Sequence, residues 1–280
     1  MSIKIVADST CDLPPELLER YDITILPLSI NKGGQFYKDG AEITPADIFA
    51  HVDAGGALCS TAAVNVSEFT DCFAQYSSRH DAVICVTISA EMSSCYQNAC
   101  LAAESFPNVH VVDSRNLSSA QGLIALEAAR LAQQGLSGQE IAVMLDEETA
   151  KVQSSFLLDR LDYMKKGGRC SAVTALGANL LHLKPCIEVH DGRMGVGKKY
   201  RGSFDHCMAQ YTKELLARYP DRRTDTVLVV HPAADPAAVE AAMRVLREDG
   251  GFHEIYEART GCTVACHCGP NTIGVMFISR

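Results

Sequence analysis

The first half of the chain alternates short apolar runs with longer stretches in which apolar residues recur at helical spacing. The expected strands are 3–7, 23–30, 82–88 and 109–112. Their β-branched residues are typical of strands buried on both faces. Asp12 is expected to cap the first helix, and the stretch 119–134 is apolar on nearly all sides, which indicates a helix covered by several neighbours. Repeated strand–helix units predict an α/β domain with a parallel sheet in three layers.

The pattern changes after about residue 150. The expected elements are strands 152–157, 226–231, 254–258 and 274–278, a hairpin over 185–200, and helices 173–183, 205–219 and 235–249. Asp191-Gly192 is a favoured type I′ corner for the hairpin, whereas 261–269 is expected to be a polar connection. Helices mixed with a hairpin indicate a two-layer α+β domain. Since no long linker is visible, we expect domains 1–150 and 151–280 to pack with a cleft between them.

Polar residues follow the strands of the first domain. Ser89, Ser93 and Ser94 lie between the strand 82–88 and an alanine-rich helical pattern. Their hydroxyls and the unpaired N–H groups of a first helical turn favour an anion, although the serines could also be simple helix caps. Similar polar pairs follow three other segments, namely Asp8-Ser9, Ser60-Thr61 and Asp113-Ser114. Ligands of doubly wound sheets lie beyond the carboxyl ends of the strands, so these residues predict an anion site there.

Composition and charge narrow the possible functions. A chain of 280 residues with 47% hydrophobic content can form two cored domains, and the absence of tryptophan indicates an aliphatic core. The net charge of −9 argues against nucleic acid as the main partner, because a phosphate-binding surface is basic. No run of eighteen apolar residues is present, so no membrane insertion is expected. Neither GxGxxG nor a P-loop motif occurs, and no cofactor is expected.

Twelve cysteines raise the question of disulfides or metal binding. Several lie inside apolar segments, and the first residues do not resemble an export signal, so we expect free thiols in a reducing cytoplasm. One cluster, Cys262, Cys266, His267 and Cys268, contains soft ligands suited to zinc. Its last three residues are too close together to share one tetrahedral ion easily. No metal is therefore expected, and a metal or redox protein is kept as an alternative.

Six motifs occur in an order and spacing that resemble the DegV family over essentially the whole chain. They are Asp8-Ser9-Thr10-Cys11-Asp12-Leu13-Pro14, the segment 60–69, the segment 89–97, Val112-Asp113-Ser114, the segment 161–169, and His267-Cys268-Gly269-Pro270. The resemblance implies a first domain similar in fold to that of dihydroxyacetone kinase. It also implies that a fatty acid is held between two α/β domains, as in the binding subunits of bacterial fatty acid kinase.

The resemblance also implies particular site residues. Thr61 and Ser93 match the family's carboxylate-binding hydroxyls, Arg169 and Arg201 match the arginines near the head group, and His267 matches the family's histidine. Ser60, Ser89 and Ser94 are expected to support them. This chain departs from the family pattern near the head group at Ala62, Ser94, Cys95, Cys266 and Cys268.

The function that we expect from this resemblance is that of a carrier. The protein would bind a long-chain fatty acid and present its carboxylate to a partner kinase, which would form an acyl phosphate, so the chain itself would not be an enzyme. Physical chemistry agrees, because hydroxyls and an arginine can compensate a partly buried carboxylate. The alternative is a serine hydrolase with Ser93 as nucleophile and His267 as base, but the sequence has no GxSxG elbow and no clear third member.

Overall fold

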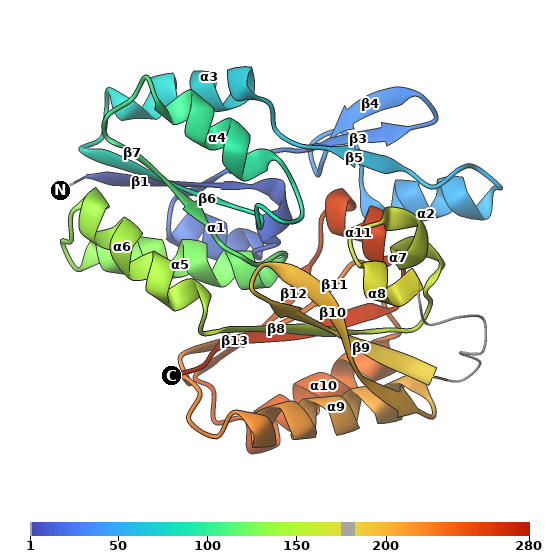
Figure 1. Ribbon diagram of the computed structural model, residues 1–280. Helices are drawn as coiled ribbons and strands as arrows, with labels where there is room; N and C mark the ends of the chain where they lie inside the picture. The colour runs from blue at the N-terminus through green and yellow to red at the C-terminus, as the bar shows by residue number, and fades with distance from the viewer. Residues whose placement is uncertain (1, 175–182) are drawn as a thin grey trace.

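Three β-sheets with helices around them make up the protein in our computed structural model, which describes residues 2–174 and 183–280 (Figure 1). The expected helix 173–183 lies mostly outside the described residues. Within them, α8 (Ser171–Thr174) is helical, and Leu183 already belongs to a strand. The strands form three sheets: a parallel sheet from the first half of the chain, a mixed sheet from residues after 150, and a small sheet beside both.

The first sheet is parallel throughout, as predicted. Its strands lie in the order β2 (Ile23–Leu26), β1 (Ile3–Asp8), β6 (Ala82–Thr87) and β7 (Val109–Asp113). Helices α3 (Val66–Ser77) and α4 (Cys95–Ala103) cover one face, and α1 (Pro15–Arg20), α5 (Ser119–Gln133) and α6 (Gly138–Thr149) cover the other (Figure 1). The buried run of six apolar or small residues in β6 explains why both faces need helices.

The second sheet has six strands. Their order is β10 (Arg193–Arg201), β9 (Leu183–His190), β8 (Val152–Leu158), β13 (Thr272–Ile278), β11 (Thr226–His231) and β12 (Glu254–Arg259). Helices α9 (Phe204–Arg218) and α10 (Pro236–Asp249) cover its outer face. The predicted hairpin corner is confirmed, because Asp191 and Gly192 both have positive φ, at 49° and 80°.

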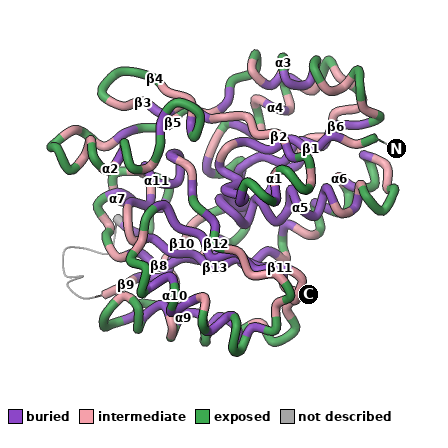
Figure 2. The backbone as a smooth tube through the Cα atoms, turned by 180° about the vertical axis from the view of Figure 1, so that it is seen from behind, coloured by how far each residue is buried: buried purple, intermediate pink, exposed green. Residues whose placement is uncertain are grey.

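Helix α5 lies between the two large sheets. Its apolar residues share one core with β1 of the first sheet and with Leu228 and Met276 of the second. Twelve of its 15 residues are buried, which confirms the prediction of a helix covered on several sides (Figure 2). At Gly122 the packing is so close that a Cβ atom would lie 2.5 Å from the carbonyl oxygen of Cys11.

Two of the expected elements were wrong in extent or type. The expected strand 23–30 is two strands, because Pro27 cannot donate a ladder hydrogen bond, and β3 (Ser29–Lys32) turns into a separate antiparallel sheet with β4 (Gln35–Lys38) and β5 (Ser60–Ala62). The expected polar connection 261–269 contains a helix, α11 (Cys262–Cys268). Both corrections concern residues of the candidate site, since Thr61 lies on β5 and His267 on α11.

The short helices near this small sheet have clear start and stop signals in the sequence. Helix α2 (Pro45–Asp53) begins after Thr44, which forms a capping box with Asp47. Helix α7 (Asp162–Gly167) ends at Gly168, whose φ of 71° is the left-handed conformation that glycine adopts easily. This turn leaves Arg169 just after the helix.

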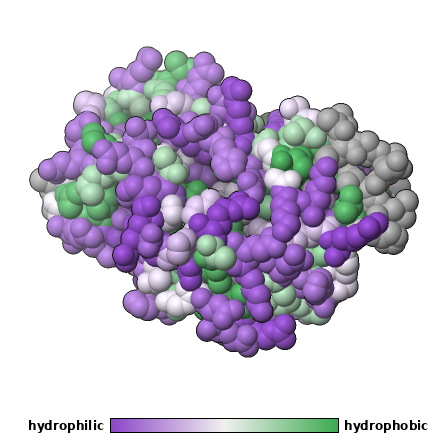
Figure 3. Space-filling model, turned by 60° about the horizontal axis from the view of Figure 1, so that its bottom comes forward, coloured by the Kyte–Doolittle hydropathy of each residue, from purple (hydrophilic) through white to green (hydrophobic). Residues whose placement is uncertain are grey.

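The outer surface is mainly polar where it can be viewed. Hydrophilic residues dominate the face in Figure 3, and its apolar residues form small groups. Among the described residues, no helix has the length and apolar character needed to cross a bilayer.

Candidate functional site

A cavity of about 360 Å³ lies where the small sheet, the loop after β6, the hairpin strand β10 and helix α11 meet. Both halves of the chain contribute to its wall. The described residues that line it are Leu28, Thr61, Ala62, Ala63, Ile88, Met92, Ser93, Ser94, Leu117, Arg169, Met194, Thr263, Val264, His267 and Cys268. The wall therefore combines a set of hydroxyls, a histidine and an arginine with a larger apolar surface.

Thr61 and His267 form a hydrogen-bonded pair in this wall. The Thr61 Oγ1 lies 2.9 Å from the His267 Nε2, although the residues are 206 positions apart. Burial, together with the nearby charge of Arg169, lowers the pKa of His267 to about 4, while the Gly167 backbone opposes this shift. The imidazole is therefore neutral near pH 7. A Cβ atom on Gly167 would lie 2.6 Å from His267 Nδ1, so a glycine is needed at this contact.

Ser93 lines the cavity and also acts as a weak cap. Its Oγ accepts from the backbone N–H of Cys95 at 3.3 Å, at the start of α4, so the cap interpretation and the site interpretation both describe it. Ser94 lines the cavity too, and its side chain makes no capping hydrogen bond. The two hydroxyls that precede α4 therefore lie in the cavity wall, beside the N-terminus of a helix.

Arg169 gives the cavity wall its positive charge. It is exposed, and its Nη1 donates to the carbonyl of Gly167 at 2.9 Å. No aspartate or glutamate is among the described lining residues, and Arg169 is the one lysine or arginine among them. The potential there consequently favours an anion, and the guanidinium geometry suits a carboxylate.

Three predicted site residues lie outside the cavity wall. Arg201 is exposed at the end of β10, where it pairs with Leu183 in the sheet, and Ser60 is exposed on β5. Ser89 is buried, and its Oγ donates to the carbonyl of Gly192 at 2.8 Å. Ser89 thus fastens the turn after β6 to the corner of the β9–β10 hairpin. The structure does not bring Arg201, Ser60 or Ser89 to the cavity.

The acidic strand ends have structural partners. Asp8 accepts from the backbone N–H groups of Thr10 and Ile88, and burial raises the pKa of its carboxyl. The expectation that Asp12 caps α1 was wrong, because the chain at Asp12 turns into the left-handed conformation (φ 44°). Its carboxylate instead accepts from Gly261 N–H and Ser118 Oγ, each at 2.6 Å, and burial raises the pKa of this carboxyl as well.

The site also contains residues that sequence reasoning did not identify. The apolar part of the wall comes from Leu28, Leu117, Met194 and Val264, which had only the signature of ordinary core residues. Asp39 lies outside the cavity wall and no sequence motif pointed to it, yet its buried carboxylate accepts from the first N–H groups of α11.

The cysteines near His267 do not form a ligand set. Cys262 Sγ donates to the carbonyl of Ile43 at 3.1 Å, and burial raises the pKa of the Cys268 thiol to about 12. In the part of the chain that the structure describes, no group of three or more histidine, cysteine or acidic side chains could hold a metal ion.

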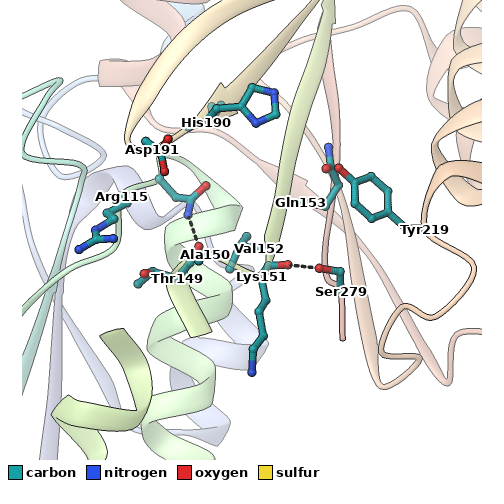
Figure 4. Close-up of a pocket in the computed structure, with 12 residues that line it drawn as sticks. Arg115, Thr149, Ala150, Lys151, Val152, Gln153, His190, Asp191, Tyr219 and Ser279 are labelled. Carbon is teal, nitrogen blue, oxygen red and sulfur yellow. Dashed lines mark hydrogen bonds between the residues drawn. The ribbon is translucent and has the colours of Figure 1, made fainter. Parts of the chain in front are cut away.

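A second, smaller cavity of about 180 Å³ lies at the start of β8 (Figure 4). It is polar, and none of the predicted site residues line it. Two of its cations already have acidic partners, since Arg115 pairs with Asp146 and Lys151 with Glu148. The carbonyl of Lys151 accepts from Ser279. The acidic Asp191 also lines this cavity, so its wall is less suited to an anion, and the first cavity is the candidate site.

Comparisons with known proteins identify the family of this chain. A family model described as "Uncharacterised protein, DegV family" matches residues 2–280. A DegV domain-containing protein of Clostridium acetobutylicum is 33% identical over 280 residues, which cover 99% of each chain. Among solved structures, a DegV family protein of Thermus thermophilus described as binding fatty acid has a TM-score of 0.93 and 30% identity, with both chains covered completely.

A stearic acid-binding protein of Eubacterium ventriosum is also similar to this chain. Its TM-score is 0.86 at 30% identity, and the match covers 99% of this chain and 98% of that one. The agreement of the family model, the full-length relative and the fold leads to one conclusion: this chain belongs to the DegV family.

Proposed function

We propose that this protein binds a long-chain fatty acid in the cavity of about 360 Å³, with the carboxylate at the hydroxyl and arginine end. The observation that carries the proposal is that the cavity wall combines a few polar and charged side chains with a larger apolar surface. Thr61, Ser93 and Arg169 lie in one wall with an extended apolar lining, and no acidic side chain is among its described residues. The fatty acids named for the Thermus and Eubacterium relatives are anions with this same division into a charged head and an apolar tail.

The head and the tail of the fatty acid make different contributions to the binding free energy. A tail of about fourteen methylenes at ~0.8 kcal/mol each would contribute roughly 11 kcal/mol before the costs of binding. A charge-assisted hydrogen bond to the carboxylate would contribute about 1.5–3 kcal/mol. The tail therefore determines most of the affinity, and the head-group residues fix the orientation.

Loss of the head-group donors is expected to weaken binding. Thr61→Val and Ser93→Ala should each lower fatty acid affinity about tenfold, and Arg169→Gln about 10- to 100-fold, because each removes one polar contact to the carboxylate. The measurement is displacement of a fluorescent fatty acid, together with mass spectrometry of lipid extracted from the purified protein. Ser60→Ala, on the same strand but outside the wall, is the matched control. A wild-type protein that carries no lipid and ignores added fatty acid would contradict the proposal.

The same proposal includes presentation of the carboxylate to a partner kinase. Arg169 and Ser94 are exposed, so a carboxylate beside them lies at an opening of the cavity. In the kinase reaction a carboxylate oxygen would attack the γ-phosphorus of ATP, the bond to the leaving ADP would break, and an acyl phosphate would form. The chain itself has no P-loop or GxGxxG motif, so ATP would be bound by the partner.

Hydroxylamine, which converts acyl phosphates to hydroxamates, tests the presentation step. We expect acyl hydroxamate when this protein, fatty acid, ATP and a fatty acid kinase catalytic subunit are combined. Arg169→Gln is expected to reduce the yield at fatty acid concentrations that do not saturate the variant. Equal yield from the kinase alone would show that no presenting protein is needed.

A non-catalytic role fits the site better than a hydrolase. The His267 Nε2 pairs with Thr61 rather than Ser93, and no carboxylate orients its Nδ1 within the described residues. A serine nucleophile needs a base within reach and a group that orients the base. We further propose that residues 1–150 and 151–280 act as two domains around the ligand, and that the protein works in the cytoplasm, where its twelve free thiols would stay reduced.

A further inference from the structure

Helix α11 begins without a capping side chain of its own. Its N-cap is Gly261, so the first N–H groups of the helix need partners from elsewhere. Asp39, which lies 223 residues before Cys262, supplies most of them. Its Oδ1 accepts from Cys262 N–H at 2.6 Å, and its Oδ2 accepts from Thr263 N–H at 3.0 Å and from Thr263 Oγ1 at 2.6 Å.

Asp39 also connects this helix to the segment around Leu28, which contributes to the cavity wall. Ser9 Oγ donates to Asp39 Oδ2 and accepts from the N–H of Leu28, each at 3.1 Å. The N–H of Asp39 donates to the carbonyl of Leu28 at 3.0 Å. Leu28 lines the cavity, whereas Asp39 does not. One buried carboxylate thus joins α11 to the backbone that carries a lining residue.

The local geometry is specific for an aspartate beside a glycine. The Asp39 side chain is 4% exposed and makes no ion pair with a lysine or arginine among the described residues. Its negative charge instead meets the positive end of α11. A Cβ atom on Gly261 would lie 2.9 Å from Asp39 Oδ1, so a larger residue at 261 would push the carboxylate away.

The position of α11 decides what the cavity contains. Val264, His267 and Cys268 are spaced at i, i+3 and i+4, so they share the helix face that lines the cavity. A small rotation or shift of a seven-residue helix would separate His267 from Thr61. We propose that Asp39 is a positioning residue of the binding site, which fixes α11 so that His267 meets Thr61. This inference rests on the proposed function for its effect on the ligand, but not for its effect on His267.

The test compares Asp39→Asn with Asp47→Asn. An asparagine keeps the shape of Asp39 but loses the charge and one of the two acceptor oxygens. Asp47→Asn weakens the capping box of α2, which shares an apolar cluster with α11, but it removes no hydrogen bond to α11. In the lipid-free proteins, histidine NMR should show the pKa of His267 moving from about 4 toward 6.5 in Asp39→Asn, and unchanged in Asp47→Asn. Affinity for a fluorescent fatty acid should fall at least tenfold in Asp39→Asn alone.

The outcomes of this experiment distinguish a failure of the proposed role of Asp39 from a failure of the proposed function. If Asp39→Asn is folded, and both the His267 titration and the affinity stay within twofold of wild type, Asp39 has no positioning role. If Asp39→Asn does not fold, Ser9→Ala serves instead, because it removes one partner of the carboxylate; it should shift the His267 titration in the same direction by less, and an unchanged titration overturns the proposal. If wild type binds no fatty acid, the proposed function fails, while the lipid-free titration still decides the role of Asp39.

Discussion

The Ala63→Trp variant is expected to bind long-chain fatty acid at least 100-fold more weakly than wild type while it keeps its fold. Ala63 follows β5, is partly buried and lines the cavity, so an indole there would occupy the space that the tail needs. Exclusion of about four methylenes at ~0.8 kcal/mol each would cost roughly 3 kcal/mol, which corresponds to more than a 100-fold change in the dissociation constant. Calorimetric titration with palmitate would measure it.

A matched control and a chain-length series sharpen this test. Ala57→Trp places the same side chain at an exposed position a few residues earlier, outside the cavity wall, and should bind as wild type does. In wild type, each two-carbon shortening of the acid should weaken binding about 15-fold. In Ala63→Trp this dependence should flatten for acids longer than the remaining space. Wild-type affinity in Ala63→Trp would show that the tail lies elsewhere.

The sheet and its helices could be predicted because their signals are local. The buried strand β6 has a continuous apolar run, and helix α5 shows apolar residues on every side because it lies between two sheets. The hairpin corner at Asp191-Gly192 and the capping box of α2 also depend only on residues close together in the sequence. Such features need no knowledge of distant contacts.

The site was harder to predict, because long-range contacts form it. Helix α11 is short, and carboxylates of Asp12 and Asp39, more than 200 residues earlier, bind its first N–H groups. No local pattern distinguishes it from a polar turn, so His267 was expected in the wrong element. Thr61 lies on β5, which pairs with β3 in the small sheet; β3 does not continue the first sheet because the strand β2 ends before Pro27.

The resemblance to a family supplied what local patterns could not, but not every residue that it indicated reaches the cavity. Thr61, Ser93, Arg169 and His267 are brought together in the wall, whereas Arg201 is exposed at the end of β10. The apolar lining could not be chosen from the sequence, because Leu117 or Val264 looks like any other core residue until the cavity beside it is known.

The protonation of His267 should make the stability of the lipid-free protein depend on pH. The native pKa is about 4, whereas the unfolded histidine titrates near 6.5. Between these values the unfolded chain binds a proton that the native protein does not, so stability is fully present above pH 6.5 and is lost as the pH falls toward 4. From pH 7.5 to pH 4.5 wild type should lose about 2.5 kcal/mol relative to His267→Gln, as measured by urea unfolding.

The difference between the two proteins isolates this residue, because buried carboxyls such as Asp8 and Asp12 titrate in both. Arg169→Gln is the graded control. Since the charge of Arg169 also lowers the His267 pKa, its removal should reduce the loss of stability without abolishing it. Equal pH profiles for wild type and His267→Gln would contradict the prediction. A bound fatty acid carboxylate would favour the imidazolium, so saturating ligand should narrow the difference between pH 6.5 and 4 if the head group lies beside His267.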